Sequence, residues 1–380
     1  MNEDIAVLTD FDPVLYEQAA PPLVSIFLPT SGADGLERDR ERFRDLVSEA
    51  RAELAQQRER REYANLVANL DVVAERFEDY AHSAAQGGLA VLASDERVNV
   101  LPLGFPVEER VVVGERFSLK PIMRTFLFGA HYYLLGLSAD RFALIHGDFG
   151  SLERVELPAD VPGEFSEEFP EVYDGHEGAL DYSSLENHMP PYHGYKSRND
   201  VKKEEAEKFF RSVNRAVTEH LEHAAPLPVI LVSLPEHQAM FRSFSTVPNL
   251  LDEGIEKNVD GVDFPELLQD ATAVIERARE KRDRAVAEEF GDARAAGKAT
   301  DDLDAIAFAL LERKVRALLV EEEAAIPGVY DEQTGTLTRP ADGDLADEFA
   351  QATLRQGGEV YLVDPALMPT DAGVAALYRY

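Results

Sequence analysis

Basic residues gather in one short stretch of a strongly acidic chain. The sequence holds 72 Asp and Glu against 38 Lys and Arg, a net charge of −34. Residues 196–215, here called the basic island, reverse this balance with seven basic side chains against four acidic ones. Since Lys and Arg bind phosphate oxygens, the island predicts contact with a polyanion such as RNA. The alternative is a solvated helix in which pairs such as Glu204 with Lys208 compensate one another.

The elements expected around the basic island would present it to a phosphate. A polar loop without a sustained hydrophobic period covers residues 158–200, and helical spacing of apolar residues begins near Val201 and continues to His223. Free backbone N–H groups converge with the basic side chains where such a loop enters a helix. The expected RNA-binding residues are His193, Gly194, Lys196, Ser197, Arg198, Lys202 and Lys203. No catalytic residue is expected.

Histidines offer two weak metal patterns. His220 and His223 are three residues apart near the end of the predicted helix, where an imidazole is also favoured by the helix dipole. His176, His188 and His193 lie in the long loop, but their spacing matches no known metal motif. We therefore expect neither a metal nor a cofactor.

The usual enzyme signatures are missing. The sequence has no phosphate-binding Gly-x-x-x-x-Gly-Lys-Ser/Thr, no Gly-x-Gly-x-x-Gly, no Gly-x-Ser-x-Gly and no His-Glu-x-x-His. It also has no cysteine, which excludes disulfides, thiolate metal sites and thiol nucleophiles. The missing signatures thus favour a protein that is not an enzyme.

The acidity suggests adaptation to salt. At about 1 M salt the Debye length is only about 3 Å, so an acidic surface no longer repels a polyanion at long range. An ordinary acidic protein is the alternative.

No apolar run approaches the roughly 20 residues needed to span a bilayer, and the first residues lack a signal-peptide pattern. A cytoplasmic protein without a membrane partner is expected.

Three series of strands followed by helices predict an α/β fold with three domains. The first strand of each series lies at Leu23–Thr30, near Tyr132 and at Val229–Leu234. Pro-containing joins separate the series. The expected domains are 1–117, 118–225 with a mixed sheet, and 226–380 as an α/β/α sandwich.

The order of these segments resembles the archaeo-eukaryotic peptide-chain release factors, their relative Pelota, and above all their bacterial homologues, over nearly the whole chain. Each motif is weak alone, and their shared order carries the resemblance. The matching segments are Val24–Pro29, Gly88–Leu92, Tyr133–Ser138, Arg141–Ile145, His193–Asn214, Gly357–Tyr361 and Ala375–Tyr380. The passage from His193 to Asn214 corresponds to the family's catalytic loop and the helix that follows it.

Two motifs of the family are absent. Its peptidyl-tRNA hydrolysis uses Gly-Gly-Gln in the loop, whereas here His193-Gly194 is followed by Tyr195-Lys196-Ser197-Arg198. The stop-codon motif Asn-Ile-Lys-Ser is also missing, and the corresponding residues 56–60 have a helical pattern. Codon-specific termination is therefore not expected.

The resemblance implies a factor that binds the ribosomal A site in rescue or hibernation, as Pelota-like rescue factors and the Balon-like hibernation factors do. Its implied partners are ribosomal RNA, the P-site tRNA and a translational GTPase such as elongation factor Tu. One alternative is a peptidyl-tRNA hydrolase in which His193, Lys196, Ser197 or Arg198 replaces the glutamine. Another is a non-ribosomal RNA-binding or scaffold protein, since a fold does not determine a function.

Overall fold

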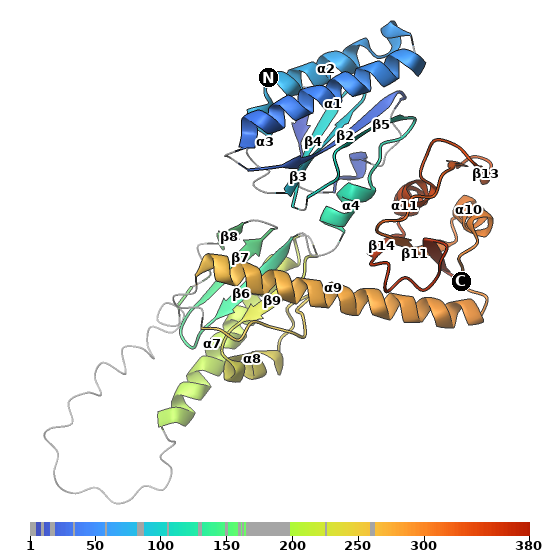
Figure 1. Cartoon of the computed structure of the whole chain (residues 1–380). Coiled ribbons are helices and arrows are strands. Elements are labelled where there is room, and N and C mark those ends of the chain that lie inside the picture. The colour runs from blue at the N-terminus through green and yellow to red at the C-terminus, as the bar shows by residue number, and fades with distance from the viewer. Residues whose placement is uncertain are drawn as a thin grey trace, which may run out of the picture. The chain divides into compact units, whose positions relative to one another are not determined.

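The chain forms two compact α/β units. The computed structural model describes all residues except 1–4, 9–10, 16–19, 33–34, 58, 82–86, 105, 128–130, 149–150, 159–160, 162, 165–197, 225 and 259–262. Unit 1 comprises Met1–Ala130 together with Arg279–Tyr380, and unit 2 comprises His131–Ala278. Helices pack against sheets in both units (Figure 1), so the predicted fold class is confirmed.

The N-terminal part of unit 1 is a sheet with helices on one face. Its strand order is β1-β4-β3-β2-β5, and only β1 and β4 are parallel. The strands are β1 (Ile5–Val7), β2 (Leu23–Thr30), β3 (Gly87–Ala93), β4 (Val98–Leu103) and β5 (Arg110–Gly114). The covering helices are α1 (Leu36–Gln57), α2 (Ala64–Glu75) and α3 (Phe77–Ala81). They bury apolar residues at helical spacing, such as Phe43, Leu66 and Phe77, against the sheet.

The C-terminal part of unit 1 is a sheet covered on both faces. Its strand order is β10-β15-β11-β14, and the hairpin β12-β13 stands beside it. The strands are β10 (Ala299–Thr300), β11 (Val315–Glu321), β12 (Val329–Asp331), β13 (Thr336–Thr338), β14 (Glu359–Val363) and β15 (Val374–Tyr378). Helices α10 (Leu303–Leu311) and α11 (Leu345–Arg355) contribute to the core on one face. Val286 and Phe290 of α9 (Phe264–Ala295) pack on the other, which gives the predicted α/β/α sandwich.

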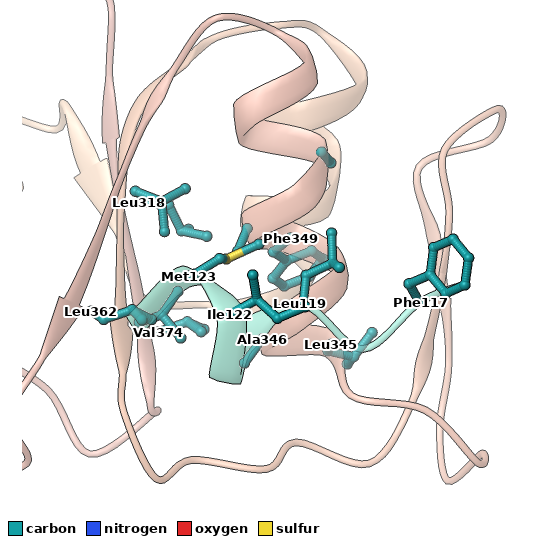
Figure 2. Packing of buried hydrophobic residues seen from close by; sticks show 14 of the residues in the cluster. Phe117, Leu119, Ile122, Met123, Leu318, Leu345, Ala346, Phe349, Leu362 and Val374 are labelled. Atoms are coloured by element: carbon teal, nitrogen blue, oxygen red, sulfur yellow. The ribbon is translucent and has the colours of Figure 1, made fainter. Parts of the chain in front are cut away.

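A joint within unit 1 ties its two parts together. The chain leaves β5 and enters α4 (Lys120–Phe126), whose Ile122 and Met123 are fully buried against the C-terminal core (Figure 2). The Leu119 N–H donates to Asp347 Oδ2 at 2.8 Å, and Gln351 Nε2 donates to the Phe117 carbonyl at 2.8 Å. Asp347 is itself buried, and burial raises the pKa of its carboxyl.

Unit 2 is built on a mixed sheet, as predicted. Its strand order is β8-β7-β6-β9, with β6 and β9 parallel and the other pairs antiparallel. The strands are β6 (Tyr132–Leu137), β7 (Phe142–Gly147), β8 (Leu152–Arg154) and β9 (Val229–Val232). Helices α7 (Arg198–Leu221) and α8 (Pro235–Arg242) pack on one face, and the first half of α9 packs on the other.

The division of the chain differs from the expected ranges 1–117, 118–225 and 226–380. The strand Val229–Val232, expected to open the last domain, pairs with β6 and so belongs to the sheet of unit 2. The second division falls inside α9, between Ala278 and Arg279. A continuous apolar run predicts a strand buried on both faces, but it does not say which sheet the strand joins.

Candidate nucleic-acid interface

The structure describes only part of the predicted RNA-binding set. His193, Gly194, Lys196 and Ser197 lie outside the described residues, as does most of the expected loop 158–200. Arg198 is the first residue of α7 and Lys202 lies within its first turns, but only their backbone is described. Lys203, on the same helix, has an exposed side chain.

The apolar stripe of α7 orients its charged side chains. The buried residues recur at helical spacing and pack on the sheet of unit 2; they are Ala206, Phe209, Phe210, Val213, Val217 and Leu221. Lys208, Arg211 and Arg215 occupy positions on the opposite side and are exposed. The helix therefore presents the described part of the basic island to solvent.

Some of this positive charge is compensated locally. Arg211 pairs with Glu207 at 2.9 Å, and its guanidinium lies 4.4 Å from the centroid of the Phe244 ring. Such an exposed i,i+4 pair contributes only about 0.3–0.5 kcal/mol, so a phosphate can replace the carboxylate. Lys203 and Lys208 form no ion pair within the part of the chain that the structure describes. The solvated-helix alternative thus accounts for Arg211 but not for these two lysines.

A groove of about 660 Å³ lies beside Lys203, between α7, α8 and the turn from β6 to β7. Its lining residues are Ala139, Lys203, Ala206, Glu207, Glu236, His237, Ala239, Met240 and Ser243. The Nδ1 atom of His237 is buried and has no hydrogen-bond partner among the described residues. Its ring meets the Phe210 ring edge-on, with centroids 5.4 Å apart.

Hydrogen bonds hold the walls of the groove in place. Helix α8 begins at Pro235, and the buried Gln238 amide donates to the carbonyls of Ser233 and Ile255, each at 3.0 Å. Asn214 of α7 accepts from the Thr246 N–H at 2.8 Å and from the Ser245 hydroxyl at 3.1 Å. These bonds tie α8 to the end of β9, and tie α7 to the segment after α8. The groove is therefore formed before any ligand arrives.

Sequence reasoning missed the groove. Glu236, His237 and Met240 come from a short helix whose packing against α7 depends on the parallel pairing of β9 with β6. The dipeptide Glu236-His237 just inside the start of a helix is the only local signal, and many solvent-exposed helices begin in the same way.

The two histidine patterns do not come together as a metal site in the described structure. His223 Nδ1 lies 3.2 Å from the carbonyl oxygen of Glu219, while His176 and His188 lie outside the described residues. Over the described ranges, no three His, Cys, Asp or Glu side chains are grouped so as to hold a metal ion. None of the described helices is long and apolar enough to cross a membrane.

Comparison with known proteins gives one family match. Residues 129–282 match the model of bacterial archaeo-eukaryotic release factor family 8. A search of curated proteins finds no match. The matched range contains all of unit 2, His131–Ala278, including α7, α8 and the groove.

Several solved structures align with the chain at low identity. The archaeal translation termination factor aRF1 is 14% identical over 98% of this chain and 99% of that chain, with a TM-score of 0.24. Archaeal Pelota, from a model of ribosome-bound Pelota and ABCE1, is 14% identical over 75% and 72%, with a TM-score of 0.41. Dom34 of S. cerevisiae is 11% identical over 82% and 78%, with a TM-score of 0.33. Scores this low support no conclusion about function.

The family match confirms the resemblance seen in the order of the sequence segments. It falls on the unit that carries the basic island, and it includes β9, in agreement with the pairing of that strand in unit 2. This chain is thus similar to the bacterial archaeo-eukaryotic release factors, and its residues 129–282 match the model of their family 8.

Proposed function

We propose that this protein is a translation factor that binds the ribosomal A site in rescue or hibernation, without codon-specific termination. One observation carries the proposal: the family match falls on unit 2, where α7 presents Lys203 and Lys208 without ion-pair partners among the described residues. In a chain of −34 net charge, two lysines without ion-pair partners in the described part of one helix would offer a local site for phosphate.

The proposed partners are ribosomal RNA, the P-site tRNA and a translational GTPase such as elongation factor Tu. In the solved structures that align with the chain, archaeal Pelota is described as ribosome-bound with ABCE1, and Dom34 as interacting with Hbs1. The GTPase partner of this chain is implied by the family resemblance of its sequence alone. Adaptation to salt, proposed from the acidic composition, would let the acidic surface approach RNA.

Peptidyl-tRNA hydrolysis is the second candidate function. It would need His193, Lys196, Ser197 or Arg198 in place of the family's glutamine, which this sequence lacks. A peptidyl-tRNA release assay with programmed ribosomes separates the two candidates. Release above the level of ribosomes alone would favour the hydrolase, and binding without release favours the rescue or hibernation factor.

Salt-dependent co-sedimentation with 70S ribosomes tests the RNA contact of the basic island. The double variant Lys196→Ala with Arg198→Ala should bind more weakly, and the slope of log affinity against log salt should fall by roughly 1 to 2 units. A matched control removes two exposed cations elsewhere, Arg284→Ala with Lys298→Ala. Equal affinity and equal salt slope for both double variants would show that the basic island does not contact the ribosome.

A further inference from the structure

The groove between α7 and α8 offers a cavity and lining side chains that the binding of a backbone phosphate alone would not require. A surface that only binds backbone phosphates needs exposed cations and no cavity. Here a cavity of about 660 Å³ adjoins the exposed Lys203 and is also lined by Glu236 and the imidazole of His237. We propose that this groove holds one unstacked base of the bound RNA, and that it prefers a base with an exocyclic amino group. This inference rests on the RNA-binding function proposed above.

The apolar lining suits the flat faces of a base. Ala139, Ala206 and Ala239 contribute small side chains, so a planar ring can approach closely. Met240 adds a polarisable thioether, and thioethers make favourable contacts with aromatic rings. Single-stranded RNA is commonly recognised by bases that leave the stack and pack on protein side chains, histidine among them.

His237 offers a ring that is already held in place. Its edge-on contact with Phe210, 5.4 Å between centroids, restricts the imidazole, so little side-chain entropy remains to be lost on binding. The Nδ1 atom is buried and has no partner among the described residues, so the ring offers the groove its exposed atoms and not this nitrogen. The exposed charges of Lys203 and Glu236 on the rim favour a nucleotide over an apolar peptide side chain, which could pair with neither.

Glu236 supplies the expected base preference. Its carboxylate is exposed, lines the groove, and forms no ion pair within the described ranges. A carboxylate accepts hydrogen bonds from an exocyclic amino group, as in the contact of Glu with cytosine N4. Uracil has no amino group and presents carbonyl oxygens instead, which a carboxylate repels. Cytosine should therefore bind better than uracil.

The charges around the groove agree with a nucleotide. Lys203 lines the groove and can contact the phosphate next to the bound base. Lys208, five residues and about 1.4 turns further along α7, lies outside the groove and adds positive charge nearby. Glu207, the other acidic residue of the lining, is already paired with Arg211 at 2.9 Å. Repulsion of the phosphate by this carboxylate is thereby reduced.

Two short oligonucleotides of matched size test the base preference. Fluorescence anisotropy with the full-length chain would compare fluorescein-labelled 12-nucleotide oligo-C and oligo-U, two pyrimidine strands that differ in the exocyclic amino group. The wild type should bind oligo-C several-fold more tightly. The variant Glu236→Gln, whose amide can also donate to uracil O4, should lose this preference. Equal affinity of the wild type for both strands would overturn the assignment to Glu236.

Salt dependence separates the base contact from the phosphate contact. His237→Ala should weaken oligo-C binding about 5- to 10-fold, about 1–1.4 kcal/mol and the low end of what one base–aromatic contact contributes, without changing the salt slope. Lys203→Ala should weaken binding and lower the slope by about one unit. Glu222→Gln, at the exposed residue that follows the far end of α7, serves as the control and should change neither.

A blocked groove gives an outcome that does not depend on any single contact. Ala239→Trp places an indole from an exposed position of the lining into the cavity, and it should weaken oligo-C binding while the melting temperature stays that of the wild type. If the groove variants leave RNA binding unchanged while Lys196→Ala with Arg198→Ala weakens ribosome binding, the base site is wrong and the proposed function stands. If the groove variants impair binding of elongation factor Tu and not of RNA, the occupant is a protein and the proposal fails.

Discussion

The joint around α4 and the groove between α7 and α8 use similar side chains in opposite ways. In the joint, Asp347 accepts from Leu119 at 2.8 Å and from Gln351 at 3.1 Å, deep inside unit 1. In the groove, Lys203 and Glu236 are exposed and form no ion pair within the described ranges. Polar groups that satisfy one another stabilise a fold, whereas polar groups left open can bind a ligand. Variants in the joint should therefore change stability, and variants in the groove should change binding.

The largest effect is expected from Asp347→Ala. Removal of the carboxylate leaves the buried Leu119 N–H without an acceptor and takes away one of the two acceptors of the Gln351 amide, which keeps its bond to the Phe117 carbonyl. Each donor hydrogen left unsatisfied costs about 1–3 kcal/mol. We expect the free energy of unfolding in urea to fall by about 2–4 kcal/mol. Asp347→Asn, which keeps one acceptor oxygen, should cost less. Asp371→Ala, at an exposed position, is the control, and a loss for Asp347→Ala no larger than for this control would contradict the account of the joint.

Glu348, the neighbour of Asp347 in α11, should give the stability of unit 1 a pH dependence. Burial raises the pKa of its carboxyl to about 7, although the Tyr330 N–H donates to it at 2.7 Å and Arg116 lies near. Because the folded-state pKa exceeds the unfolded value of 4.5, the folded chain binds the proton more tightly. The contribution of Glu348 is thus most favourable below pH 4.5 and is lost as the pH rises to about 7. Asp347 and Glu332 also face this carboxyl and act in the same direction.

Glu348→Gln isolates this effect. Urea unfolding at several pH values should show that the wild type loses roughly 1–3 kcal/mol relative to the variant between pH 4.5 and 7, with no further relative change above that range. A constant difference between the two proteins across this interval would show that the Glu348 pKa is not raised.

The smallest effect on stability is expected on the open face of α7. Arg211→Ala removes an exposed ion pair with Glu207 and a contact 4.4 Å from the Phe244 ring centroid, which together contribute about 1 kcal/mol or less. Ribosome affinity should nevertheless fall, with a salt slope lower by about one unit. A large drop in melting temperature with unchanged ribosome binding would show that Arg211, like the residues of the joint, contributes to stability and not to binding.

The sequence predicted the elements better than their assembly. The apolar runs of β2, β6 and β9 and the helical spacing in α7 located these elements, because burial imposes a period of two or 3.6 residues. The sequence did not predict that β9 pairs with β6, since strand pairing depends on contacts distant in sequence. It also did not predict that one helix, α9, contributes residues to both units. The basic island was visible as a local charge reversal. The groove was not, because it forms where α8 packs on α7.

The central claim is that the exposed lysines of α7 bind ribosomal RNA, and one measurement addresses it most directly. Co-sedimentation of 70S ribosomes with Lys203→Ala plus Lys208→Ala, over a range of salt, would be compared with Arg284→Ala plus Lys298→Ala, which removes the same charge from unit 1. We predict weaker binding and a slope lower by about 2 units for the α7 variant only, at an unchanged melting temperature. Identical affinity and slope for the two variants would contradict the claim.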